Sequence, residues 1–102
     1  MQFDFFDNTQ SGILTTRTYE EFKERLIESN CNRCDLHKGR THIVVDRGNP
    51  TTSILLIGEG PGENEDRQGK AFVGRAGQLM DELFSEIGID TNRETLIANV
   101  VK

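Results

Sequence analysis

The first hydrophobic pattern along the chain has the period of an α-helix. Apolar residues recur every three or four positions over residues 19–29, so we predict an amphipathic helix there. Thr18 stands at the N-cap position and Glu21 follows three residues later, the pair that forms a capping box. Residues 1–17 carry no sustained period, and we interpret them as an N-terminal arm before a folded portion at 18–102.

The next patterns alternate between strand and helix. Residues 53–58 are a continuous apolar run, typical of a strand buried on both faces of a parallel sheet. A glycine-rich loop follows, and residues 76–87 return to helical spacing, with Gly88 where a C-terminal cap belongs. Residues 96–101 form a second apolar strand. This order predicts a βαβ unit with two parallel strands, the building block of an α/β fold.

Two shorter signals precede this unit. Residues 43–45 are a β-branched run, and residues 47–50, with the sequence RGNP, predict a turn. A sheet of only two or three parallel strands has an open edge and an open face. We therefore expect this chain to be an incomplete part of a larger α/β fold.

Composition narrows the class of protein. With 102 residues, 34% of them hydrophobic and 28% charged, the chain is globular-like and holds one domain at most. A net charge of −5 argues against broad non-specific binding to nucleic acid, which depends on cations, but allows a local basic patch. The longest apolar run, 54–57, is too short to span a membrane, and no secretory signal begins the chain. We expect a cytoplasmic location and no membrane partner.

Cys31 and Cys34 are the only cysteines. In the cytoplasm a close pair indicates metal binding or redox chemistry in preference to a structural disulfide. His37 and His42 follow nearby, so a Cys₂His₂ zinc site is one interpretation, and surface histidines are the other.

The loop after the first apolar strand, GEGPGENEDRQGKAFVGRAGQL at 58–79, is the candidate functional segment. Its glycines suggest a phosphate-binding loop, but the nucleotide patterns fail. The Walker pattern requires a glycine where the chain has Asn64 and a hydroxyl where it has Ala71. The dinucleotide pattern requires a third glycine where the chain has Glu63. Carboxylates in the loop would also repel a pyrophosphate. These acids are Glu59, Glu63, Glu65 and Asp66.

A planar ligand suits this loop better than a phosphate. Ligands of parallel sheets bind outside the carboxyl ends of the strands, where Glu59 and Asn99 stand. The Asn99 amide can read the edge of a base, although it can also pair with strand-end backbone groups. Phe72 can stack on a planar ring or pack in the core. Arg67, Lys70 and Arg75 are solvated cations or contacts for DNA phosphates.

The loop and its flanks resemble a known family. The string G-E-G-P-G-x-x-E-D-x-x-G-x-x-F-V-G-R-A-G-Q-L at 58–79 looks like the first motif block of the family 4 uracil-DNA glycosylases. The segment N-V-V-K at 99–102 resembles that family's N-x-V-K motif. Cys31 and Cys34 stand where the family places its first two iron–sulfur ligands. The resemblance covers roughly residues 19–102.

The resemblance implies a three-layer uracil-DNA-glycosylase-like fold with a parallel sheet, of which this chain would carry the βαβ half. It also implies a [4Fe–4S] cluster, half of it held by Cys31 and Cys34. The activity implied is DNA repair by hydrolysis of the N-glycosidic bond of deoxyuridine, after the base has been flipped out of uracil-containing DNA. We expect the protein to be a monomer.

The resemblance also implies roles for individual residues. Glu59 would flank the flipped uracil and its sugar, and the backbone of Glu59 and Gly60 would line the pocket. Phe72 would stack on uracil, and Asn99 would pair with its edge and reject thymine or cytosine. Cleaving a glycosidic bond builds positive charge on the sugar, and a carboxylate such as Glu59 can stabilise that charge or orient a water.

Some family features lie outside this sequence. The family's third and fourth cysteines and its later His-containing motif follow the N-x-V-K segment. Because four thiolates normally hold a [4Fe–4S] cluster, we expect the chain by itself to lack a complete cluster site and full activity. Two alternatives stay open: a non-catalytic remnant that binds uracil or DNA, and a relative that traps the abasic sugar covalently.

Overall fold

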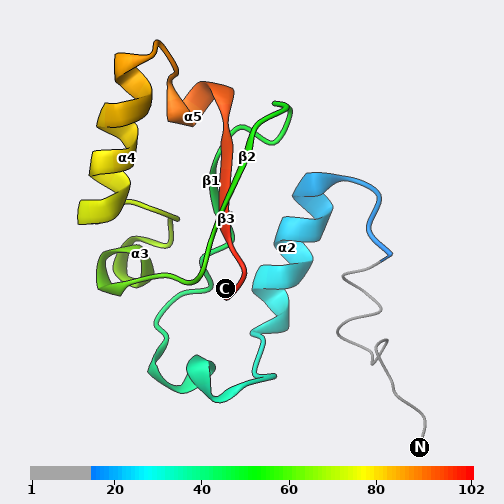
Figure 1. The fold of residues 1–102 in the computed structure, drawn as a ribbon. Helices are drawn as coiled ribbons and strands as arrows, with labels where there is room; N and C mark the ends of the chain where they lie inside the picture. Colours follow the sequence, from blue (N-terminus) through cyan, green and yellow to red (C-terminus); the bar gives the residue numbers. More distant parts are fainter. Residues whose placement is uncertain (1–14) are drawn as a thin grey trace, which may run out of the picture. The chain divides into compact units, whose positions relative to one another are not determined.

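The computed structural model describes residues 15–102, and most of the predicted arm at 1–17 lies outside them. The chain divides into two compact units, Met1–Lys38 and Gly39–Lys102. Figure 1 shows the helices and strands of the described residues. In this part of the chain, no helix is long and apolar enough to cross a membrane.

The first unit contains the predicted helix, α2 (Tyr19–Ser29). Thr18 caps it as expected, because its hydroxyl accepts a hydrogen bond of 3.1 Å from the Glu21 N–H. The Glu21 carboxylate accepts from the Arg17 N–H at 3.3 Å, one residue before the position that a capping box uses. Asn30 ends the helix in the left-handed conformation, at φ 46°. A short 3₁₀ helix, η1 (Asp35–Gly39), follows the two cysteines.

The second unit is built on a three-stranded sheet in the order β1-β3-β2. β2 (Leu55–Gly58) pairs in parallel with β3 (Leu96–Asn99), which confirms the predicted βαβ unit. β1 (Asp46–Gly48) is antiparallel to β3, so the sheet is mixed and not purely parallel. The helices between β2 and β3 are α3 (Glu63–Gln68), α4 (Arg75–Glu86) and α5 (Thr91–Glu94), of which the sequence pattern predicted only α4.

The turn predicted at 47–50 begins later than expected. Arg47 and Gly48 belong to β1, where they pair with Ile97 and Leu96. The close approach of β1 to the chain before β3 explains the glycine. Gly48 has φ 113°, and a Cβ there would lie 2.2 Å from the Thr95 carbonyl oxygen. Only glycine tolerates both conditions.

The core of this unit is small. Val44, Ala71 and Ile97 are fully buried, and three half-buried residues pack against them: Leu56, Phe72 and Met80. The prediction that the 53–58 strand is buried on both faces is wrong. Leu55 and Ile57 are 56% and 66% exposed, because successive side chains of a strand point to opposite faces and the core covers only one of them.

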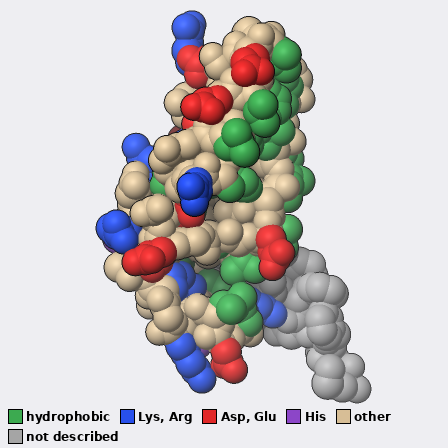
Figure 2. Space-filling model, turned by 60° about the vertical axis from the view of Figure 1, so that its left-hand side comes forward, with side chains coloured by type: hydrophobic (Ala, Val, Ile, Leu, Met, Phe, Trp, Pro, Cys, Tyr) green, Lys and Arg blue, Asp and Glu red, His purple; other side chains and the backbone are tan. Residues whose placement is uncertain are grey.

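α4 has the same one-sided character. It begins and ends within one residue of the predicted range, and Gly88 follows its C-cap at φ 82°. Met80 faces the core, but a row of apolar side chains on α4 and just after it is exposed. Figure 2 shows hydrophobic side chains gathered along one side of the molecule. The row consists of Leu79, Leu83 and Ile87, which are 54–70% exposed.

Candidate functional site

The candidate site lies where the two parallel strands end. Gly58, the last residue of β2, is the register partner of Asn99, the last residue of β3. The chain after β3 continues along the start of the loop, since the N–H groups of Val100 and Val101 donate to the carbonyls of Gly58 and Glu59. A cavity of about 130 Å³ opens beside these strand ends. Its lining residues are Gly60, Glu65, Phe72, Gly74, Arg75, Ala76, Gly77 and Asn99.

Glu65 ties the glycine-rich loop together. One carboxylate oxygen accepts from the Gly62 N–H at 3.0 Å, and the other accepts from the N–H groups of Val73, at 2.8 Å, and Gly74. Burial raises the pKa of Glu65, but the N–H groups of Gly74, Gly62 and Val73 together lower it below its ordinary value. The sequence pattern did not predict this role. Glu65 stands three positions after the N-cap, as the acid of a capping box does, but Gly62 has no side chain to form the reciprocal bond.

Asp66 fixes another part of the loop. Its carboxylate accepts from the N–H groups of Thr41 and His42, at 2.7 and 2.9 Å. Its carbonyl accepts from Nδ1 of His42 at 2.6 Å. The His42 and Thr41 N–H groups hold the pKa of Asp66 below its ordinary value. Two of the four acids that argue against a pyrophosphate ligand, Glu65 and Asp66, therefore fix the conformation of the loop.

Phe72 borders both the core and the cavity. It packs against the core residues, and its ring also reaches the cavity. A Cβ on Gly58 would lie 2.4 Å from both the Phe72 ring and the Asn99 side-chain oxygen. Gly58 therefore lets the ring and the amide converge at the strand end. Phe72 itself adopts the left-handed conformation at φ 54°, which is rare for a residue with a large side chain.

Asn99 lines the cavity and carries a buried, unpaired polar atom. The residue is 2% exposed, and its Oδ1 has no hydrogen-bond partner among the described residues. The backbone carbonyl of Asn99 accepts a hydrogen bond from Nζ of Lys102 at 2.7 Å. Leaving a buried oxygen without a hydrogen-bond donor costs about 1–3 kcal/mol in folding free energy. An N–H donor of a ligand that binds to this atom would remove that cost.

The predicted cations have different surroundings. Arg67 forms an exposed ion pair with Glu63 at 3.1 Å, four residues earlier on α3. Lys70 is exposed, and Arg75 is exposed at the start of α4, where it lines the cavity. The N-cap of α4, Gly74, has no side chain to cap the first turn, so the N–H groups of this turn stay available beside the cavity.

Three further predicted site residues, Glu59, Cys31 and Cys34, do not line this cavity. Glu59 is exposed directly after β2 and is not among the residues that line the cavity. The two cysteines belong to the first unit and are thiols, with no disulfide between them. No group of three or more His, Cys, Asp or Glu in residues 15–102 is arranged to hold a metal ion. His37 donates from Nδ1 to the Cys34 carbonyl at 2.6 Å.

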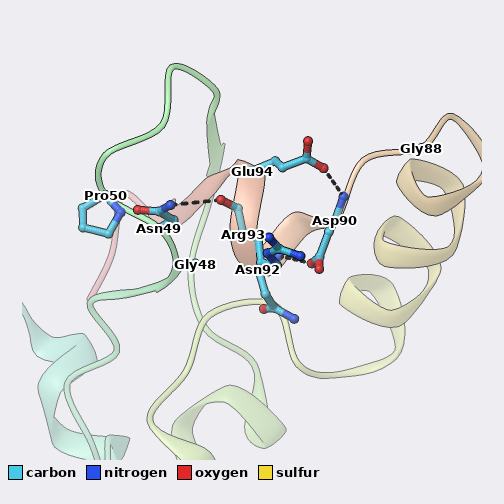
Figure 3. Close-up of a pocket in the computed structure, with 8 residues that line it drawn as sticks. All are labelled: Gly48, Asn49, Pro50, Gly88, Asp90, Asn92, Arg93 and Glu94. Carbon is cyan, nitrogen blue, oxygen red and sulfur yellow. Dashed lines mark hydrogen bonds between the residues drawn. The ribbon is translucent and has the colours of Figure 1, made fainter.

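A second cavity, of about 680 Å³, opens at the other end of the strands, and Figure 3 shows its residues. Its polar groups bond to one another. The Asn49 amide donates to the Arg93 carbonyl at 3.0 Å, and the Glu94 carboxylate accepts from the Asp90 N–H at 2.6 Å. We therefore assign the candidate site to the smaller cavity, where an unpaired amide oxygen meets an aromatic ring. The second cavity is lined by Gly48, Asn49, Pro50, Gly88, Asp90, Asn92, Arg93 and Glu94.

Comparison with known proteins shows which family the chain resembles. The family profile described as "Uracil DNA glycosylase superfamily" matches residues 45–102. A Type-4 uracil-DNA glycosylase of Thermotoga maritima is 49% identical over 87 residues, which cover 83% of this chain and 45% of that protein. The Type-4 uracil-DNA glycosylase of Sulfurisphaera tokodaii is 43% identical over 84 residues, 81% of this chain and 37% of its own length. The chain thus spans less than half the length of these relatives.

Proposed function

This chain belongs to the uracil-DNA glycosylase superfamily, and we propose that its protein removes uracil from DNA by hydrolysing the N-glycosidic bond of deoxyuridine. The observation that carries the proposal is the buried, unpaired Oδ1 of Asn99, placed beside the Phe72 ring in a small cavity at the strand ends. The names of the relatives, which are Type-4 uracil-DNA glycosylases, support the same activity.

Asn99 reads the base by hydrogen bonding. The N3–H of uracil is a donor, and Oδ1 of Asn99 is the acceptor that lacks one. The Asn99 N–H₂ group then donates to O4 of uracil. Cytosine presents an acceptor at N3, so it leaves Oδ1 unpaired and is rejected. Thymine has the same hydrogen-bonding edge as uracil, so its rejection depends on the space available to its methyl group.

Phe72 supplies the face on which the flipped base lies. Stacking on an aromatic ring offsets part of the cost of removing a base from the duplex. The backbone of Gly60, which has no side chain, lines the same cavity. Glu59 stands at the end of β2, where its carboxylate stabilises the positive charge that develops on the sugar or orients the attacking water. Arg67, Lys70 and Arg75 contact DNA phosphates.

The [4Fe–4S] cluster of the family is only half provided for in this chain. Four thiolates hold such a cluster, and the sequence contains two cysteines. We propose that Cys31 and Cys34 are two of its ligands and that the others come from outside these residues. Iron and sulfide analysis of the anaerobically purified complete gene product tests this; Cys31→Ala should remove the bound iron. The cytoplasmic location and the monomeric state stay predictions.

The test of the activity is excision from a single-stranded oligonucleotide that carries one uracil, by the complete gene product that contains this chain. Asn99→Ala and Phe72→Ala should each lower excision at least tenfold, while Glu86→Gln, exposed at the end of α4, should leave it unchanged. Absence of excision by the wild-type protein would contradict the proposal. Tight binding without product would favour the non-catalytic remnant, and a denaturation-resistant protein–DNA adduct would favour the covalent-trapping relative.

A further inference from the structure

Arg47, a residue of β1, reaches the loop that carries Phe72. Its side chain is 9% exposed. Nε donates to the Ala71 carbonyl at 2.8 Å, and Nη2 donates to the Phe72 carbonyl at 2.7 Å. The guanidinium group therefore binds two successive carbonyl oxygens of the loop, a match that depends on its rigid fork of donors.

The other donors of Arg47 are also engaged. Nη2 pairs with the Asp81 carboxylate of α4 at 3.1 Å, and Nη1 donates to the Asn92 side chain of α5 at 2.9 Å. Thr91 completes the group, because its hydroxyl lies 3.4 Å from Nη1 and donates to Asp81 at 2.7 Å. With partners on three elements, the guanidinium group has one orientation, and the two loop carbonyls are held in a defined place.

The part of the loop that Arg47 holds is the part with an unusual conformation. Phe72 has φ 54°, and a residue in this region persists only when its surroundings impose it. The Phe72 carbonyl is fixed between Arg47 and the start of α4, where a Cβ on Gly77 would lie 1.9 Å from its oxygen. On the following side, Glu65 holds the Val73 N–H. A cation and an anion thus fix the backbone on either side of the ring.

We propose that Arg47 is a positioning residue for recognition of the base: it imposes the left-handed conformation of Phe72 and thereby places the ring beside Gly58 and Asn99. Arg47 does not itself line the cavity, so it acts through Phe72. The proposal rests on the proposed function for the identity of the ligand, but the placement of the loop can be measured without any ligand.

The first measurement is amide hydrogen exchange in the complete gene product. Arg47→Lys keeps the charge, but a single ammonium group cannot replace a fork that binds two carbonyls and three side chains. We expect exchange at residues 71–74 to rise at least tenfold in Arg47→Lys, with exchange in β3 unchanged. Arg93→Lys, an exposed arginine on α5, is the matched control and should change neither. Unchanged exchange at 71–74 overturns the proposal, whether or not the protein binds uracil.

The second measurement is a double-mutant cycle on binding of a single-stranded oligonucleotide with one uracil. Arg47→Lys should weaken binding about tenfold in the wild-type background and have no further effect in the Phe72→Ala background. Equal effects in both backgrounds would mean that Arg47 does not act through Phe72, which overturns the proposal. Failure of the wild-type protein to bind or excise uracil contradicts the proposed function instead, and the exchange result still decides the role of Arg47.

Discussion

The loop at the candidate site and the exposed apolar surface of the Gly39–Lys102 unit differ in one respect. The polar groups of the loop find their partners within this chain, whereas the apolar side chains have no element of this unit covering them. On the side of the candidate site, the loop after β2 is held by Glu65, Asp66 and Arg47, and each bonds to two or more backbone groups. Elsewhere on this unit, β2, α4 and the residue after α4 present apolar side chains that are more than half exposed. These are Leu55, Ile57, Leu79, Leu83 and Ile87.

The difference teaches what each kind of interaction requires. The loop is shaped by hydrogen bonds between residues at most 25 positions apart, all present in this chain. An apolar row is buried only if another element covers it. Single exposed apolar residues are ordinary, but a contiguous row is typical of a surface that contacts other protein. In both relatives, more than half of the protein lies outside the region that matches this chain.

Truncation of the core should have the largest effect. Ile97→Ala removes a fully buried side chain of the core against which Phe72 packs, and we expect a loss of about 2–5 kcal/mol in the free energy of unfolding. Urea unfolding followed by circular dichroism measures it. A loss below about 1 kcal/mol would mean that the site side is not built on this core.

Gly77→Ala should come second. The added Cβ would lie 1.9 Å from the Phe72 carbonyl oxygen, so the start of α4 or the loop must shift. We expect a cost of about 1–3 kcal/mol and loss of uracil binding. The control is Gly39→Ala, where a Cβ meets nothing within 4 Å. If the two variants unfold at the same urea concentration, the close packing of loop and helix is wrong.

Loss of the Glu65 charge should have a smaller effect that depends on pH. The folded-state pKa of Glu65 is lowered, so its contribution is present above the unfolded value of 4.5 and is lost as pH falls toward the folded value. In Glu65→Gln, one acceptor oxygen is replaced by a donor group facing backbone N–H groups. We expect a loss of about 1 kcal/mol at neutral pH, after allowance for solvent screening.

The pH dependence separates Glu65 from Asp66, whose pKa is also lowered, from 3.8. Stability of the wild type and of Glu65→Gln should converge as pH falls below 4.5, while Asp66 contributes equally to both. A constant difference between the two proteins from pH 7 to pH 3 would contradict the role of the ionised carboxylate.

Truncation on the apolar side should have the smallest effect. Leu83 is 54% exposed, so Leu83→Ala should change the free energy of unfolding of this chain by no more than about 0.5 kcal/mol. The same substitution in the complete gene product sharpens the comparison. A cost there of about 2 kcal/mol would show that further protein covers this side, and the same cost in this chain by itself would break the comparison.

Local patterns were sufficient for much of the fold. The helical spacing at 19–29 and 76–87 predicted α2 and α4 closely, and the order of apolar runs predicted the parallel pairing of β2 with β3. The glycine-rich loop was correctly placed at the strand ends, because parallel strands bring their carboxyl ends together. The motifs in the loop also pointed to the family that the comparison shows.

The antiparallel β1, the exposed face of β2 and the role of Arg47 could not be predicted in this way. Arg47 was assigned to a turn, since RGNP is a turn sequence and nothing nearby identifies Ala71 and Phe72 as its partners. Likewise, the apolar run of β2 indicated two buried faces, but burial depends on which other elements are present to cover them.

The sequence by itself determined where the helices, the parallel strands and the glycine-rich loop lie, because these depend on spacing, capping and glycine content within a few residues. Only the tertiary structure decided that Glu65 and Asp66 are ties of the loop, that Phe72 is held in a left-handed conformation, and that Asn99 keeps an unpaired oxygen. Those properties arise from contacts between distant segments, and the free energy of a buried polar atom depends on which neighbour the fold brings to it.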